Sequence, residues 1–214
     1  MPGVVVALDV LDKFIKIGNE LTKLPALLLP QYRAAAISLY EICQKLLTAN
    51  ENIARWLYKF QYFDFSQADS QKAFRDLCRD YKTMKVGPER RALKFRCGDI
   101  DLIYRKEIES RIGGWFTGSQ RADDTRLIFS QLASADGSMI EFIDSNIVSQ
   151  LDAFVAEAEG LVDTNDMGGA EAARLRFKAA NAEMSRRLEQ FSGELSDLVL
   201  QFARIGGVPV TLGN

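Results

Sequence analysis

An apolar stripe at positions 35–60 constrains the fold of this chain more than any other sequence feature. The spacing between its members alternates between four and three residues. They are Ala35, Leu39, Ile42, Leu46, Ala49, Ile53, Trp56 and Phe60. At 3.6 residues per turn, this spacing places all eight on one face of an α-helix. No glycine or proline lies between Tyr32 and Phe65, so the stripe predicts an uninterrupted rod at about 31–62, roughly 45 Å long.

A second stripe of the same kind lies near the end of the chain. Its members are Met184, Leu188, Phe191, Leu195, Leu198, Phe202 and Ile205. It predicts a second long rod at about 170–205, which the pair Gly206-Gly207 ends because glycine favours the position just after a helix. The remaining residues, including Pro209, predict an extended tail.

Shorter helices are expected between and before the two rods. The apolar spacing predicts a first helix at about 4–23, and Ser66 with Asp69 resembles a capping box that would begin a third helix. The chain is therefore predicted to be all-α, an antiparallel bundle of six or seven helices. We expect one domain built from an N-terminal helical half (1–112), a Gly-rich loop (113–122), a C-terminal helical half that packs on the first (123–206) and an extended tail (207–214).

The amino-acid composition excludes several kinds of chemistry. The chain has no histidine, which removes Ser-His-Asp and Cys-His catalysis and every histidine-ligated metal site. Its three cysteines, Cys43, Cys78 and Cys97, are widely spaced and predict reduced, buried thiols rather than a disulfide framework or a zinc site. We therefore expect no enzyme, no cofactor and no metal. The N-terminus lacks the basic region of a signal peptide and no apolar stretch is long enough to span a membrane, so we expect a cytoplasmic protein.

Charge is distributed unevenly along the chain. Nine basic residues lie between Lys72 and Arg96, whereas the segment 127–173 contains nine acidic residues and no lysine or arginine. We expect these two blocks to lie on opposite faces and to serve partner binding or self-association. The alternative is that they pack together and neutralise each other. The residues we propose for partner binding are Arg79, Lys82, Lys85, Arg90, Arg91, Lys94, Trp115, Phe116, Asp144, Asp152 and Glu159.

Aromatic residues concentrate at the end of the first rod. Six of the ten residues from Trp56 to Phe65 are aromatic. They are expected to form a core that closes one end of the bundle, and a ligand pocket lined by aromatic rings is the alternative. Trp115 and Phe116, next to glycines, either fold back over the bundle or anchor it to a membrane or a protein groove.

These observations favour a non-enzymatic helical interaction module, such as an adaptor, regulator or assembly subunit, that uses segregated basic and acidic faces. The alternative is a membrane-active or membrane-recruited bundle of the cell-death or defence type, using the N-terminal amphipathic helix and Trp115 with Phe116. A protein partner or self-association is expected and an anionic membrane is a second possibility. Nucleic acid is disfavoured because the acidic block opposes binding to a polyanion.

Overall fold

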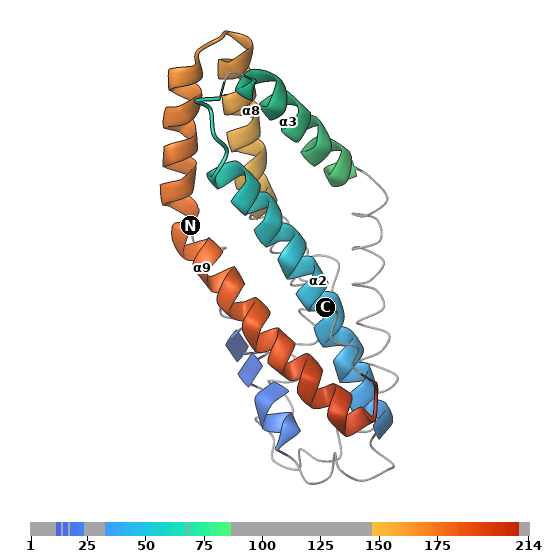
Figure 1. The fold of residues 1–214 in the computed structure, drawn as a ribbon. Coiled ribbons are helices and arrows are strands. Elements are labelled where there is room, and N and C mark those ends of the chain that lie inside the picture. Colours follow the sequence, from blue (N-terminus) through green and yellow to red (C-terminus); the bar gives the residue numbers. More distant parts are fainter. Residues whose placement is uncertain are drawn as a thin grey trace.

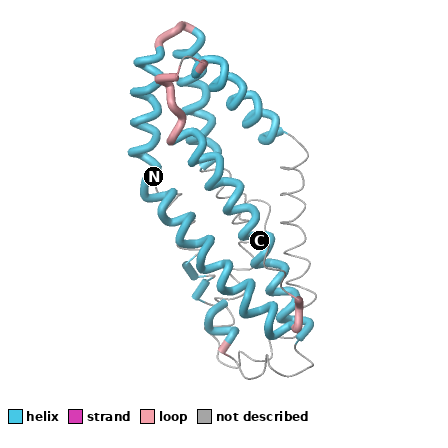
Figure 2. Tube along the Cα trace, viewed as in Figure 1, coloured by secondary structure: helices cyan, strands magenta, loops and turns pink. Residues whose placement is uncertain are grey.

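The structure is a computed structural model that describes residues 12–13, 15–16, 18–23, 33–67, 69–86 and 147–209. Its helices are α2 (Arg33–Gln61), α3 (Ser70–Val86), α8 (Ser149–Asp163) and α9 (Met167–Gly206), together with helical turns within 12–22. Figures 1 and 2 show an all-helical arrangement, and the described residues include no β-strand. The all-α prediction is confirmed, whereas the number of six or seven helices is not, because the intervening segments lie outside the described residues.

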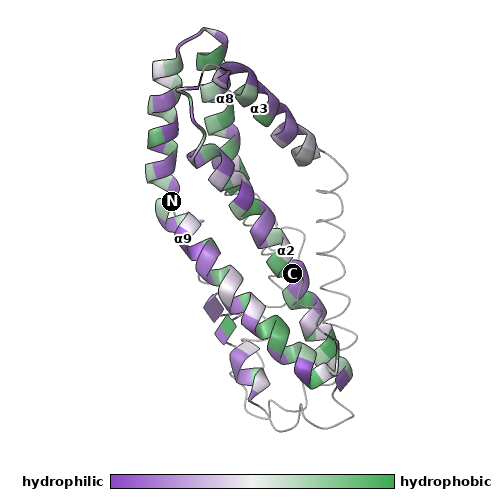
Figure 3. Ribbon diagram, viewed as in Figure 1, coloured by the Kyte–Doolittle hydropathy of each residue, from purple (hydrophilic) through white to green (hydrophobic). Residues whose placement is uncertain are grey.

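The two long rods pack side by side in antiparallel directions (Figure 1). Ile37, near the start of α2, contacts Gly206 at the end of α9, while Gln61 at the end of α2 bonds to Arg174 near the start of α9. This interface is the largest between helices of the described part. Hydrophobic and hydrophilic residues alternate along both rods in Figure 3, as expected when one side of each helix is buried. The predicted rods at 31–62 and 170–205 are thus confirmed.

Both ends of α9 have clear capping interactions. The Asp166 carboxylate accepts a hydrogen bond from Gly169 N at 2.9 Å, which satisfies one free N–H of the first turn. After the helix, Gly207 adopts a left-handed conformation with φ of 67°. Its N–H donates to Arg204 O and the N–H of Val208 donates to Ala203 O, the pattern of a Schellman motif. The predicted stop at Gly206-Gly207 is confirmed.

The start of α3 differs from the prediction. Ser66 does not cap the helix, because its N and its Oγ both donate to Asp64 at 2.9 and 2.6 Å. The hydrogen bond of the Ser66 hydroxyl first, then those of the Gln67 side chain and of Ser66 N, lower the pKa of Asp64 to about 2. The helix begins at Ser70, whose Oγ donates to Phe65 O at 3.1 Å. The predicted capping box is wrong because Asp64, two residues earlier, competes for Ser66.

A cluster of aromatic rings fills the space where α2, α3, α8 and α9 meet. The ring centroid of Phe60 lies 5.4 Å from that of Tyr81, 6.2 Å from Phe74 and 5.8 Å from Phe154. Phe154 in turn stacks on Phe177 at 4.5 Å. These edge-to-face and stacked contacts are the geometry that aromatic pairs prefer. The inward rings of the 56–65 segment therefore belong to the core, as predicted.

The segment 12–22 packs on α9. Ile15 and Leu21 are buried, and Gly18 lies so close to Leu198 that an added Cβ would be 2.7 Å from Leu198 Cδ1. Asp12 forms an ion pair with Arg187 at the exposed edge of this contact.

Two of the three cysteines lie in the core. Cys43 and Cys78 are both free and fully buried, as the sequence predicted, and Cys97 lies outside the described residues. Burial raises the pKa of both thiols above the ordinary value, that of Cys78 to about 12.

Candidate interaction surface

Three large hydrophobic side chains are exposed in the described part of the structure. Tyr58 is 62% exposed, Tyr62 is 54% exposed and Leu175 is 52% exposed. Two come from the end of α2 and one from the start of α9, the ends that Arg174 and Gln61 hold together. Single exposed apolar residues need no explanation, but a group of them does.

A contact between Tyr62 and Lys178 joins these side chains across the two helices. Tyr58 and Tyr62 lie one helical turn apart, with ring centroids 4.7 Å from each other. Lys178 Nζ lies 4.0 Å from the centroid of Tyr62, within the range of a cation–π contact. Leu175 precedes Lys178 by three residues and so shares its face of α9. The side chains of one surface thus come from two helices.

Two further cations border these residues on α2. Lys59 Nζ lies 4.6 Å from the ring centroid of Trp56. Arg55, exposed, precedes Lys59 by one turn. We call this surface the aromatic–cation patch; its members are Arg55, Tyr58, Lys59, Tyr62, Leu175 and Lys178.

The helical segments that carry the patch contain no acidic residue. Positions 52–63 and 172–182 include five arginines and lysines but no aspartate or glutamate. Two of these cations are already paired, Arg174 with Glu171 and Arg176 with Glu157. Arg55, Lys59 and Lys178 form no ion pair within the part of the chain that the structure describes. The patch is therefore positively charged, and its cations rest on aromatic rings or face solvent.

Arg174 fixes the two helices beneath the patch. Its Nη1 donates to the carbonyl oxygen of Gln61 at 2.5 Å, which satisfies a free C=O at the end of α2. Its Nε and Nη2 both bond to the Glu171 carboxylate, an arrangement that raises the pKa of Arg174 and lowers that of Glu171. Gln61 also bonds through its side chain to Ser185 at 2.9 Å. The patch thus stands on a rigid joint between the rods.

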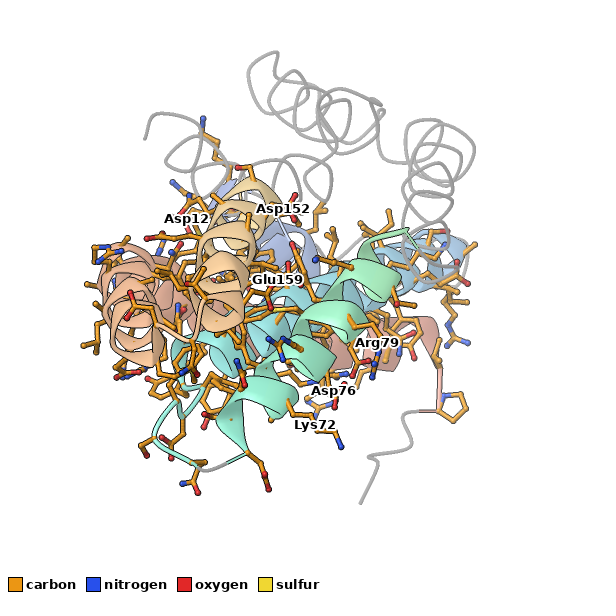
Figure 4. The ribbon with its side chains drawn as sticks, turned by 90° about the horizontal axis from the view of Figure 1, so that it is seen from above. Asp12, Lys72, Asp76, Arg79, Asp152 and Glu159 are labelled. Atoms are coloured by element: carbon orange, nitrogen blue, oxygen red, sulfur yellow. The ribbon has the colours of Figure 1, made fainter. Side chains whose placement is uncertain are left out.

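The sequence proposed several residues for partner binding. Those that the structure describes already form hydrogen bonds or ion pairs within the molecule. Lys82 Nζ lies 2.5 Å from Glu159 Oε2, a hydrogen bond that raises the pKa of Lys82. Asp152 accepts a hydrogen bond of 2.9 Å from the Tyr81 hydroxyl. Arg79 pairs with Asp76 on its own helix at 2.9 Å. In Figure 4, Glu159 lies between α8 and α3, whereas Asp76 and Arg79 lie on the side of α3 away from α8.

These contacts correct one expectation. The basic helix α3 and the acidic helix α8 do not lie on opposite faces in the described part but pack beside each other. Arg75 repeats the contact of Lys82, with its Nη2 2.9 Å from Asp163 Oδ1. The charge blocks are neutralised here because opposite charges on neighbouring helices attract. The other proposed residues lie outside the described part: the Lys85 side chain, Arg90, Arg91, Lys94, Trp115, Phe116 and Asp144.

The patch residues were not among those proposed from the sequence. Tyr58 and Tyr62 were grouped with the aromatic core, although their positions on a helix already separate them from Phe60. The absence of acids from 52–63 and 172–182 is the signal that could have identified them, but only the fold shows that the two segments meet.

Comparison of the chain with protein-family models, with curated proteins and with solved structures finds no match. None of the described helices combines the length and apolar character that a membrane span requires. Within the same residues, no three aspartate, glutamate or cysteine side chains gather into a group able to hold a metal ion.

Proposed function

We propose that this chain is a non-enzymatic helical interaction module that binds a protein partner through the aromatic–cation patch. The observation that supports the proposal is a group of exposed side chains from two helices: Tyr62 contacts Tyr58 on its own helix and Lys178 on α9, and Leu175 lies one turn before Lys178. Tyrosine and arginine are enriched in protein interfaces, because each offers a large contact area together with a polar group.

The location of this surface revises the sequence-based hypothesis. The charged residues of α3 and α8 already form ion pairs with each other, such as Lys82–Glu159 and Arg75–Asp163. A partner that bound there would have to replace existing ion pairs. At the patch, by contrast, the cations Arg55, Lys59 and Lys178 have no carboxylate partner to lose among the residues that the structure describes. Binding there has the smaller cost of desolvation and rearrangement.

Rigidity also favours the patch as a binding site. Residues that are already held in place lose less conformational freedom on binding. Tyr58 and Tyr62 each have only two side-chain torsions, and the ring of Tyr62 is held between Tyr58 and Lys178. The helices below are joined by Arg174 and by the Gln61–Ser185 hydrogen bond.

Site-specific photo-crosslinking tests the proposal. A photoreactive phenylalanine analogue replaces Tyr62 in the full chain, produced in the cells that naturally make it. A matched variant carries the analogue at Thr48, which is exposed on the same helix but lies outside the patch. We expect a discrete protein adduct from position 62 and none from position 48. Equal labelling from both positions, or no adduct from position 62, would rule out the patch as the docking site.

A second function is favoured by the kind of residues in the patch. Tyrosine and lysine side chains are typical of proteins that lie at the membrane–water interface. A membrane-recruited bundle would use Tyr58, Tyr62 and Lys178 against lipid. Its N-terminal helix would need to leave α9, where Ile15 and Leu21 are buried. Co-sedimentation with anionic and with neutral vesicles separates this function from the first, because only membrane recruitment predicts that the vesicles deplete the protein from solution.

A further inference from the structure

We infer that the partner of the aromatic–cation patch is an acidic helical segment of a protein, with carboxylates one turn apart and an apolar side chain between them. This inference rests on the proposed function and specifies the chemistry of its partner.

Charge complementarity is the first argument. Of the five cations in the two acid-free segments, Arg174 and Arg176 have carboxylate partners at 2.5 and 2.6 Å. Arg55, Lys59 and Lys178 have none in the described part of the chain. Lys59 and Lys178 lie over aromatic rings instead. A carboxylate supplied by a partner could form an ion pair with each of these cations, and the cation–π contacts of Lys59 and Lys178 would stay intact.

Spacing is the second argument. Arg55 and Lys59 are four residues apart on α2, and so are Tyr58 and Tyr62. Each pair therefore repeats once per helical turn, with cations and rings side by side. A helix laid along α2 presents its own residues i and i+4 with the same repeat. Acidic residues at that spacing match Arg55 and Lys59, and an apolar residue between them meets the exposed rings.

The borders of the patch argue against a continuous polyanion. Glu51 lies one turn before Arg55, and Asp64 lies two residues after Tyr62. A nucleic acid or an anionic bilayer extends beyond three cations and would meet these carboxylates. A short acidic segment can end where they begin. The borders thus select for a discrete anionic partner by repelling an extended one.

Two peptides test the inference directly. The first is a fluorescent 15-residue helical peptide with glutamates four residues apart and leucines between them, and the second has glutamine in place of every glutamate. We expect the glutamate peptide to bind the full chain, measured by fluorescence anisotropy, and the glutamine peptide to bind at least about tenfold more weakly. The affinity for the glutamate peptide should fall as salt rises, because the contacts are exposed and are screened.

Charge-reversal variants locate the binding site. Arg55→Glu with Lys178→Glu should lower the affinity for the glutamate peptide by about tenfold or more. The matched control is Arg33→Glu with Lys72→Glu, which makes the same change of charge at exposed cations outside the patch. The control should bind as the wild type does, and circular dichroism should show both variants folded. A third peptide, with lysine in place of each glutamate, should bind the patch variant and not the wild type.

Three results would overturn the inference. They are equal binding of the glutamate and glutamine peptides, no measurable binding of the glutamate peptide at low salt, and equal loss of affinity in the patch and control variants. Tighter binding of a single-stranded oligonucleotide or of anionic vesicles, lost only in the patch variant, would reassign the patch to a polyanion. A crosslink from position 62 that persists in the patch variant would keep the proposed function but reject an acidic partner. Absence of that crosslink in the wild type would reject the proposed function itself.

Discussion

Lys82 Nζ on α3 lies 2.5 Å from Glu159 Oε2 on α8, so two regions of opposite charge that are far apart in the sequence form a direct contact. Arg75 and Asp163 form a second ion pair between the same helices, and the side-chain amide of Gln71 donates to Val162 O at 2.8 Å. The Tyr81 hydroxyl adds a partly buried hydrogen bond to Asp152 on α8. Together they align α3 on α8.

Reversal of the Lys82–Glu159 pair tests this contact. Lys82→Glu should lower the free energy of unfolding by about 1 kcal/mol, because an exposed ion pair contributes that much at most and the new glutamate faces Glu159. Lys82→Glu combined with Glu159→Lys should recover most of the loss. Urea unfolding at low salt measures both. Lys72→Glu, a change at an exposed lysine of the same helix, is the control and should have little effect. Glu159→Lys alone completes the comparison: if the double variant loses as much free energy of unfolding as the two single variants together, the contact does not form in solution.

The sequence predicted the two rods well and the relationship between α3 and α8 poorly. The rods follow from local periodicity, since the apolar residues from Leu39 to Phe60 must share one helix face whatever the helix packs against. Which helices are neighbours depends on the tertiary fold, and no local pattern places Lys82 beside Glu159. The start of α3 was mispredicted for a related reason. Ser66 can cap a helix or bond to Asp64, and the sequence alone does not decide between them.

Asn50 is a buried polar residue between the rods, and its replacement has an unusual expected outcome. Its Nδ2 donates to Leu188 O at 2.8 Å and to Ser192 Oγ at 2.7 Å, while its Oδ1 has no hydrogen-bond partner among the described residues. An unsatisfied buried acceptor costs about 1–3 kcal/mol. Asn50→Leu should therefore leave the free energy of unfolding unchanged or raise it by about 1 kcal/mol. Asn50→Asp should lower it, because a charge would be buried without a partner.

Urea unfolding of both Asn50 variants measures the difference. Thr48→Val, at an exposed position on the same helix, reports the effect of a polar-to-apolar change without burial. If Asn50→Leu lowers the free energy of unfolding by more than about 2 kcal/mol, the hydrogen bonds to α9 outweigh the unsatisfied oxygen.

The close contact of Gly18 with Leu198 predicts a size limit at position 18. Leu198 is fully buried, and a Cβ at position 18 would lie 2.7 Å from its Cδ1. Gly18→Val should thus lower the free energy of unfolding by about 1–3 kcal/mol through overpacking. Leu198→Ala alone should also be destabilising, by about 2–5 kcal/mol. The double variant should lose less free energy of unfolding than the two single variants together, because the alanine leaves room for the valine.

Gly193 provides the matched control for position 18. It lies inside α9, and an added Cβ there would have no atom within 4 Å. Gly193→Ala should raise the free energy of unfolding by about 0.5–1 kcal/mol, since alanine is the better helix former. Strict additivity of Gly18→Val and Leu198→Ala would show that the N-terminal helix does not pack on α9 at this point.

The candidate site was harder to predict than the fold, and the reason is physical. Tyr58 and Phe60 are both aromatic and only two residues apart, yet Phe60 is fully buried and Tyr58 is exposed. Helical periodicity predicts that they face different directions, but not which direction meets the core. Lys178 is 116 positions after Tyr62 in the sequence, and only the antiparallel packing of the rods brings it over that ring.

The two buried thiols predict how stability depends on pH. In the unfolded chain a cysteine has a pKa of about 8.5. Burial raises the pKa of Cys43 and Cys78 in the folded state, the latter to about 12. As the pH rises above about 8.5, the unfolded state therefore releases protons that the folded state keeps. The contribution of each thiol to stability is fully present below that pH and is lost as the pH rises toward the folded pKa, by up to about 1.4 kcal/mol per pH unit.

Urea unfolding between about pH 7.5 and 9.5 tests this dependence. A Cys97→Ser background leaves only the two described thiols. We expect the free energy of unfolding to fall with a slope that approaches two protons at the upper end of the range. In Cys43→Ala with Cys78→Ala the slope should largely vanish, although the starting stability will be lower because of the lost packing. A thiol reagent should react with neither cysteine in the folded protein and with both in urea, because only a thiolate that reaches the surface is nucleophilic. An identical slope with and without the two cysteines would show that they are not the groups that titrate.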